Sequence, residues 1–240
     1  MVRIFYLANL VLLYLLSVYL AKYRTTSYFL FMKDHKFFWL HLISTVCLMQ
    51  SFILQAQPKK VVIAYVFSIK KIINPDSIDA AKLTHINYAF VNVRDGKAWL
   101  EQPGIDSINF EHLRELKKVN PALKILISIG GWSWSKNFSD ASLTDSSRKI
   151  FAESAAAIVD QYQLDGVDID WEYPGMRGDS NRFRPDDKQN YTGICKGLRL
   201  SLDSLSAKNK KRYELTTATG GFPEYLAHTE MDKAQHYLAL

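Results

Sequence analysis

The chain has 240 residues, a length that suits one large domain, and its formal net charge at neutral pH is +6. Residues 1–57 hold five of the 30 basic residues but only one of the 24 acidic residues, so the remaining chain is nearly neutral and offers no basic stripe for a nucleic acid. Because there are two cysteines, Cys47 and Cys195, a disulfide framework and a cysteine metal site are excluded.

The N-terminal part contains two apolar runs, residues 4–20 and 37–54. A basic segment beginning at Met32 precedes the second run and a polar stretch with an alanine follows it, which is the order of a secretory signal peptide. We therefore interpret residues 1–31 as an upstream extension of the reading frame. We expect a secreted domain that begins close to Gln57 and has no stable membrane association. The alternative, a membrane hairpin of two helices, would also export the domain.

Residues 58–240 form the predicted domain, in which short apolar runs alternate with amphipathic stretches. Five of these runs predict strands, at residues 61–67, 85–93, 123–131, 164–172 and 213–219. Asn74 opens a short predicted helix, and Asp95-Gly96 predicts a turn after the second strand. Three longer helices are predicted from apolar faces at Phe110–Val119, at Phe151–Tyr162 with Thr144 as N-cap, and at Tyr191–Leu205, which includes Cys195 as a core residue.

Repeated strand–helix units imply parallel strands that are joined by helical crossovers. An open, doubly wound sheet and a (β/α)8 barrel both have this rhythm. In a barrel, active sites lie at the carboxyl ends of the strands. Trp132 after the third strand and Glu172 at the end of the fourth would then face the same opening.

The fourth strand carries the most informative pattern, because Asp168, Asp170 and Glu172 alternate with apolar residues. Alternate side chains of a strand share one face, and three carboxylates on one face are costly unless that face lines a site. Crowding raises the pKa of at least one carboxyl, which suits the acid chemistry of glycoside hydrolysis. The spacing alone also fits a solvated edge strand or a magnesium or calcium site. The neighbouring Trp171 and Tyr173 favour a sugar site over a metal cage.

Residues 165–172, Asp-Gly-Val-Asp-Ile-Asp-Trp-Glu, resemble the Asp-x-x-Asp-x-Asp-x-Glu pattern of family 18 glycoside hydrolases, the chitinases and their relatives. Four other segments resemble strands of the same family: Val62–Phe67, Ile86–Phe90, Ser128–Ser133 and Leu215–Ala218. The resemblance covers residues 61–240 and implies a (β/α)8 TIM barrel of which strands one to five are present, with a sixth beginning at Tyr237. An eight-stranded barrel cannot close with five strands. We therefore expect the chain to be a fragment, poorly soluble and nearly inactive alone, and a monomer when complete.

The resemblance implies a role for each acid. Glu172 would be the general acid, and the substrate's own N-acetyl oxygen would be the nucleophile. Asp170 would orient the acetamido group and stabilise positive charge, while Asp168 would share a proton with Asp170. Asp165 falls off the alternation and is expected to be structural, and Ser128 could donate a hydrogen bond to Asp168.

Aromatic residues near the predicted opening are candidates for sugar binding. Trp132 follows two glycines at a strand end and is expected to stack on a sugar face. Tyr173, Tyr65 and Phe67 are further candidates, although a buried aromatic ring more often belongs to the core. The histidines have no clustered ligand partners, so we expect no metal, and we expect no cofactor.

The leading hypothesis is a secreted chitinase that acts on chitin or on N-acetylglucosamine oligosaccharides. An endo-β-N-acetylglucosaminidase that trims N-glycans could use the same acids. A non-catalytic chitinase-like lectin is a third possibility, which the presence of Glu172 disfavours because lectin relatives typically lose that acid.

Overall fold

The computed structural model describes residues 60–68 and 70–238. The predicted leader with its start at Met32, and the last two residues, Ala239 and Leu240, lie outside the described residues. Apart from Lys60, the described residues belong to one structural unit, Val61–Leu240. Among them, no helix combines the length and the apolar character that crossing a bilayer requires.

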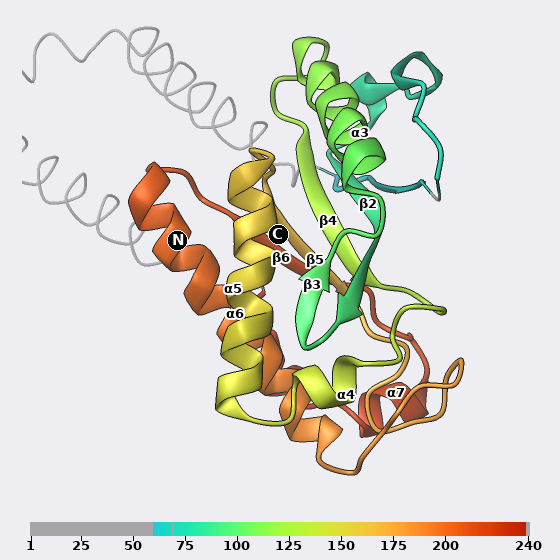
Figure 1. Cartoon of the computed structure of the whole chain (residues 1–240), viewed down its shortest axis with the longest axis vertical. Helices are drawn as coiled ribbons and strands as arrows, with labels where there is room; N and C mark the ends of the chain where they lie inside the picture. The colour runs from blue at the N-terminus through green and yellow to red at the C-terminus, as the bar shows by residue number, and fades with distance from the viewer. Residues whose placement is uncertain (1–59, 69, 239–240) are drawn as a thin grey trace, which may run out of the picture. The chain divides into compact units, whose positions relative to one another are not determined.

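Five parallel strands form the sheet and stand side by side in chain order (Figure 1). They are β1 (Ile63–Phe67), β2 (His85–Arg94), β4 (Lys124–Gly130), β5 (Gly166–Asp170) and β6 (Glu214–Thr217). Apolar and β-branched runs such as 125–129 form the inner strands because side chains on both faces of the sheet are buried. All five predicted strands are confirmed, but the fourth ends at Asp170 and not at Glu172.

The fourth strand is shorter than predicted because its pairing with both neighbouring strands ends before Glu172. Just beyond β4, the backbone N–H of Gly131 donates to the carbonyl of Asp170 at 2.8 Å, and the pairing with β4 ends there. On the other side, β6 pairs only as far as Ile169. Trp171 and Glu172 therefore lie past the strand, at the carboxyl end of the sheet.

A short hairpin extends from β2. The strand β3 (Lys97–Trp99) pairs with it antiparallel, so that Lys97 stands opposite Arg94. The two residues between them, Asp95 and Gly96, have φ angles of 51° and 71°, as a type I′ turn requires. The predicted turn is confirmed, whereas the three-residue strand after it is too short for a periodic signal.

Three long helices follow the strands: α3 (Pro103–Glu115), α5 (Asp145–Gln161) and α6 (Asp187–Asn209). In Figure 1, α5 and α6 run alongside each other and cover the sheet. The short helices are α4 (Phe138–Ala141), α7 (Pro223–Ala227) and α8 (Met231–Ala234), with 3-10 turns η2 (Pro75–Ser77), η3 (Ala80–Lys82) and η4 (Leu116–Lys118).

The helix predictions hold in most details. Thr144 caps α5 and forms a reciprocal capping box with Ser147, and the predicted face of α6 is buried, including Cys195. The helix predicted from Asn74 is instead the pair of 3-10 turns η2 and η3. Val119 was predicted on the apolar face of α3 but is 68% exposed, because the α-helix ends at Glu115 and the chain tightens into η4.

The core lies between the sheet and the helices, and the apolar side chains of the acidic strand β5 are buried in it. Val167 and Ile169 are fully buried there, and the Trp171 ring stacks on Phe138 with centroids 5.2 Å apart. The acids of β5 alternate with these residues, as predicted. At the end of the described chain, Tyr237 and Leu238 lie in the turn that follows α8.

Candidate active site

The acidic row lies at the carboxyl end of β5, where neighbouring strands supply its partners. The register places Ser128 of β4 beside Asp168 on one side and Thr216 of β6 beside it on the other. Gly130 stands beside Asp170, where a Cβ atom would collide with the backbone carbonyl of Asp170. Glycine at this position therefore allows the backbones of the two strands to approach closely.

Three hydroxyl groups hold Asp168, which is 1% exposed. Tyr65 and Ser128 donate to its Oδ2 at 2.9 and 2.8 Å, and Thr216 donates to its Oδ1 at 2.5 Å. Burial raises the pKa of Asp168, and the three hydroxyl donors oppose that rise because they stabilise the ionised form. The predicted hydrogen bond from Ser128 is present.

The next two acids are more open. Burial, followed by the negative charges of Glu172 and Asp168, raises the pKa of Asp170 to about 7. Burial also raises the pKa of Glu172, while a hydrogen bond with Tyr173 partly offsets it. Both oxygens of Asp168 are taken by hydroxyls, and within the described residues no hydrogen bond joins it to Asp170. The sharing of a proton between the two carboxyls stays a prediction.

A small hollow of about 180 Å³ opens beside these acids. Its lining comes from the end of β5 and from the segment after β6: Asp170, Trp171, Glu172, Tyr173, Ala218, Thr219, Gly220 and Tyr225. The two more open carboxyls thus face a cavity that a small group of a ligand could enter.

Aromatic rings surround a second hollow of about 210 Å³, lined by Phe67, Phe90, Gly130, Trp132, Ser133 and Trp134. Trp132 is 52% exposed and Phe67 is 63% exposed, so both offer ring surface to solvent. The ring of Tyr173 lies 6.2 Å from that of Trp132, edge to face, on the side of the acids. Phe90 had been missed although it ends a segment that carried the family resemblance, and Trp134, also missed, stands just after another such segment.

Tyr65, a candidate for sugar binding, makes a contact that was not predicted. Its hydroxyl donates to Asp168 and helps to hold that acid in place. Its ring is half exposed, and sugar binding by this ring stays a prediction. Thr216 was missed by the sequence analysis. Its position beside Asp168 depends on the register between two strands 48 residues apart, which the local pattern does not reveal.

Asp165 lies at the other end of the strand and is structural in its contacts. It forms ion pairs with Lys117 and Lys211 at 2.5 and 2.9 Å and accepts a hydrogen bond from the Ile125 N–H. Burial alone would raise the pKa of Asp165, but these donors outweigh burial and hold the pKa below its usual value. Within the described ranges, no group of three or more ligating side chains is placed to hold a metal ion.

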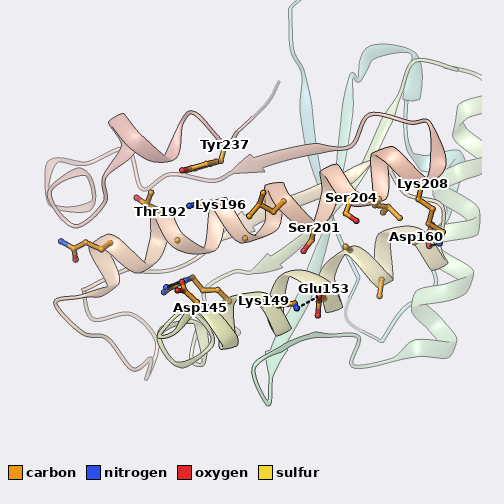
Figure 2. Close-up of a pocket in the computed structure, with 18 of the residues that line it drawn as sticks. Asp145, Lys149, Glu153, Asp160, Thr192, Lys196, Ser201, Ser204, Lys208 and Tyr237 are labelled. Atoms are coloured by element: carbon orange, nitrogen blue, oxygen red, sulfur yellow. Dashed lines mark hydrogen bonds and ion pairs between the residues drawn. The ribbon is translucent and has the colours of Figure 1, made fainter.

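A larger groove of about 1000 Å³ runs between α5 and α6 (Figure 2). Several of its charged side chains form ion pairs, as Lys149 does with Glu153 within α5 at 3.8 Å and Lys208 of α6 with Asp160 of α5 at 2.8 Å. None of the acids of β5 contributes to its lining. The groove therefore lies apart from the perturbed carboxyls, which mark the candidate active site.

A parallel sheet covered by helices, with an acidic row and exposed aromatic rings at the carboxyl ends of its strands, is the arrangement typical of barrel-type glycoside hydrolases. Residues 61–239 match the family described as "Glycosyl hydrolases family 18", and the chain belongs to this family. Family 18 domains are (β/α)8 barrels, and the described sheet with its helices is an incomplete barrel of that kind, which confirms the predicted fold class.

Several known proteins are similar to this chain. Chitinase A1 of Niallia circulans is 38% identical over 206 residues, which cover 67% of this chain and 30% of the relative. Chitinase 1 of Aphanocladium album is 32% identical over 190 residues, covering 69% and 43%. The chain thus spans less than half the length of these two curated relatives.

Solved structures agree with the family. Chitinase ChiA74 from Bacillus thuringiensis matches with a TM-score of 0.71 and 32% identity, over 75% of this chain and 38% of that one. A family 18 N-acetylglucosaminidase from Paenibacillus barengoltzii matches with a TM-score of 0.66 and 38% identity, over 74% and 51%.

Proposed function

We propose that the protein is a chitinase that hydrolyses β-1,4-linked N-acetylglucosamine polymers and retains the configuration of the anomeric carbon. Family membership and the bacterial and fungal relatives described as chitinases support the substrate class. The observation that carries the proposal is the contrast along the acidic row. Burial raises the pKa of all three acids, but three hydroxyl donors oppose that rise only at Asp168, whereas Asp170, with a pKa of about 7, and Glu172 open onto a hollow. Such a division suits acid catalysis beside a charge stabiliser.

In this proposal Glu172 is the general acid. The carbonyl oxygen of the substrate's N-acetyl group bonds to the anomeric carbon while the glycosidic C–O bond breaks, and the proton of Glu172 passes to the departing oxygen. Water then attacks the anomeric carbon, the bond between that carbon and the acetamido oxygen breaks, and Glu172 accepts the proton that the water releases. Two displacements at one carbon give net retention, and no protein carboxylate is bonded to the sugar.

The other two acids support the reacting sugar. Asp170 would orient the acetamido N–H and stabilise the positive charge of the oxazolinium-like intermediate. Asp168 would tune Asp170 by sharing a proton, so the pair should titrate as a unit. The hollow beside Asp170 and Glu172 is where a group of the bound sugar would meet both carboxyls. The exposed ring of Trp132 would stack on a sugar face.

The test is turnover of N-acetylglucosamine hexamers by the whole protein and by Glu172→Gln, which keeps the shape of the side chain but removes its proton. We expect kcat to fall about 100-fold or more, with little change in KM, because the lost interaction is made in the transition state. Glu153→Gln is the matched control, since Glu153 lies on the outer surface of α5. Equal turnover by both variants would contradict the proposal.

An N-acetylglucosaminidase is the second candidate, because the Paenibacillus barengoltzii structure is described as such an enzyme. An endo-acting form on N-glycans would release sugars from a high-mannose glycoprotein and leave colloidal chitin intact, and the chitinase would do the reverse. A lectin would bind chitin or the glycoprotein without cleaving either.

Secretion is part of the proposal and depends on the leader sequence. We expect N-terminal sequencing of exported protein to find a start close to Gln57. Protein that begins at Met1 and stays in the membrane fraction would contradict the signal-peptide interpretation and favour the membrane hairpin.

A further inference from the structure

A buried serine holds the backbone of Glu172 in place. Ser135 lies between β4 and α4 and is 0% exposed. Its Oγ accepts a hydrogen bond from the N–H of Glu172 at 2.8 Å. The same hydroxyl lies 2.9 Å from the carbonyl oxygen of Gly131 and 3.1 Å from that of Asp170, and it donates its proton to this pair. We infer that Ser135 is a positioning residue for the general acid, an inference that rests on the proposed function.

Glu172 needs such a support because it lies beyond the sheet. β5 ends at Asp170, and the N–H of Gly131 takes up the carbonyl of Asp170, so neither neighbouring strand reaches Glu172. The hydroxyl of Ser135 replaces the missing strand partner. It ties the turn after β4 to the last residue of β5 and to Glu172 in one hydrogen-bonded group.

A second contact from the same part of the chain holds the loop that follows. The N–H of Gly175 donates to Oδ2 of Asp187 at 3.3 Å, and Ser139 of α4 donates to Oδ1 of Asp187 at 2.6 Å. The segment 135–139 thus fixes the chain directly at Glu172 and, through Asp187, three residues later. Of these two contacts, only that of Ser135 is made to Glu172 itself.

The consequence is an effect on proton transfer without an effect on binding. Ser135 is buried and touches no solvent, so it does not contact substrate. A displacement of about 1 Å at a catalytic group can lower a rate about 100-fold. Loss of the hydroxyl would therefore slow the hydrolysis of substrates whose leaving group needs the proton of Glu172. The hydrolysis of substrates whose leaving group departs without protonation would change little.

The experiment compares the whole protein with Ser135→Ala on two substrates. One is an N-acetylglucosamine oligosaccharide, whose leaving group is a sugar hydroxyl, and the other is a 2,4-dinitrophenyl glycoside of N-acetylglucosamine disaccharide, whose leaving group is a stable anion. We expect kcat on the oligosaccharide to fall about 10- to 100-fold at unchanged KM, and kcat on the dinitrophenyl glycoside to change little. Ser142→Ala is the matched control, because Ser142 is equally buried and, within the described residues, its hydroxyl donates only to the carbonyl oxygen of Ser139.

Ser135→Thr keeps a hydroxyl and should restore much of the oligosaccharide activity. Equal loss on both substrates, or no loss on either, would overturn the inference.

Amide hydrogen exchange separates a failure of the inference from a failure of the proposed function, because it needs no turnover and no variant. The Glu172 N–H of the unsubstituted protein should be protected like the amides of β5. Fast exchange there would overturn the inference even in an active enzyme. Protected exchange in a protein that cleaves neither substrate would overturn the proposed function alone.

Discussion

Replacing Thr216 by valine tests whether Asp168 is ionised at neutral pH. The substitution removes the hydroxyl that donates to Oδ1 at 2.5 Å. A hydrogen bond to a charged group contributes about 1.5–3 kcal/mol and one between neutral groups about 0.5–1.5 kcal/mol. If Asp168 is ionised at neutral pH, Thr216→Val should lower the free energy of unfolding by about 1.5–3 kcal/mol at pH 7. The loss should be about half as large in acid.

The sign follows from the pKa of Asp168. Burial raises this pKa above its unfolded value, so the carboxyl favours folding most below about pH 4, and that contribution is lost as the pH rises through the folded-state pKa. Removing a donor raises the folded-state pKa further. The free energy of unfolding of the variant therefore falls furthest below that of the unsubstituted protein at pH values above the folded-state pKa.

Urea denaturation at pH 7 and pH 4 measures the difference. Thr216→Ser is the control, because it keeps the hydroxyl and loses a methyl group, which contributes about 0.8 kcal/mol at either pH. An equal decrease in the free energy of unfolding of Thr216→Val at both pH values would refute the reasoning. It would mean that the change of side-chain shape, and not the charge on Asp168, causes the destabilisation.

Three further predictions concern the proposed mechanism and the fold. Partly deacetylated chitosan should yield oligomers whose new reducing ends carry N-acetylglucosamine; glucosamine at those ends just as often would exclude the acetamido nucleophile. Burial raises the pKa of Glu172, whose proton the proposed mechanism needs, so kcat should fall as the pH rises through the pKa of this acid, and a profile that stays flat up to pH 9 would contradict this. Asp165→Asn should destabilise the fold by about 2–3 kcal/mol in urea denaturation, less than a fully buried pair because Lys117 and Lys211 reach solvent. Since the pKa of Asp165 is lowered on folding, its stabilisation is present at neutral pH and lost as the pH falls through the folded-state pKa, so a penalty that does not become smaller as the pH falls below about 4 would contradict the ion-pair account.

The parallel strands were predictable because each is a short apolar run, and the acidic row because its residues alternate with buried ones. Both signals are local. The short strand β3 was not predicted, because three residues carry no periodicity, and the exposure of Val119 reflects a change of helix type that the spacing did not reveal.

The partners of the acids were only partly predictable. Ser128 was predicted as a donor to Asp168, but Thr216, which also stands in a segment that resembles the family, and Ser135 were not. Both act through contacts between segments 37 to 48 residues apart, which are set by strand register and by the turn after β4. Such contacts depend on the assembled sheet, and a single sequence does not specify them locally.

The three hydroxyls around Asp168 also have a consequence for the order of folding. They come from β1, β4 and β6, at separations of 103, 40 and 48 residues along the chain. During synthesis, Tyr65 and Ser128 leave the ribosome before Asp168, and Thr216 follows it by about 2–10 s at ordinary elongation rates. For that interval the nascent chain must leave this carboxyl partly unsatisfied, so the sheet around it gains its full stability only after β6 has emerged and paired.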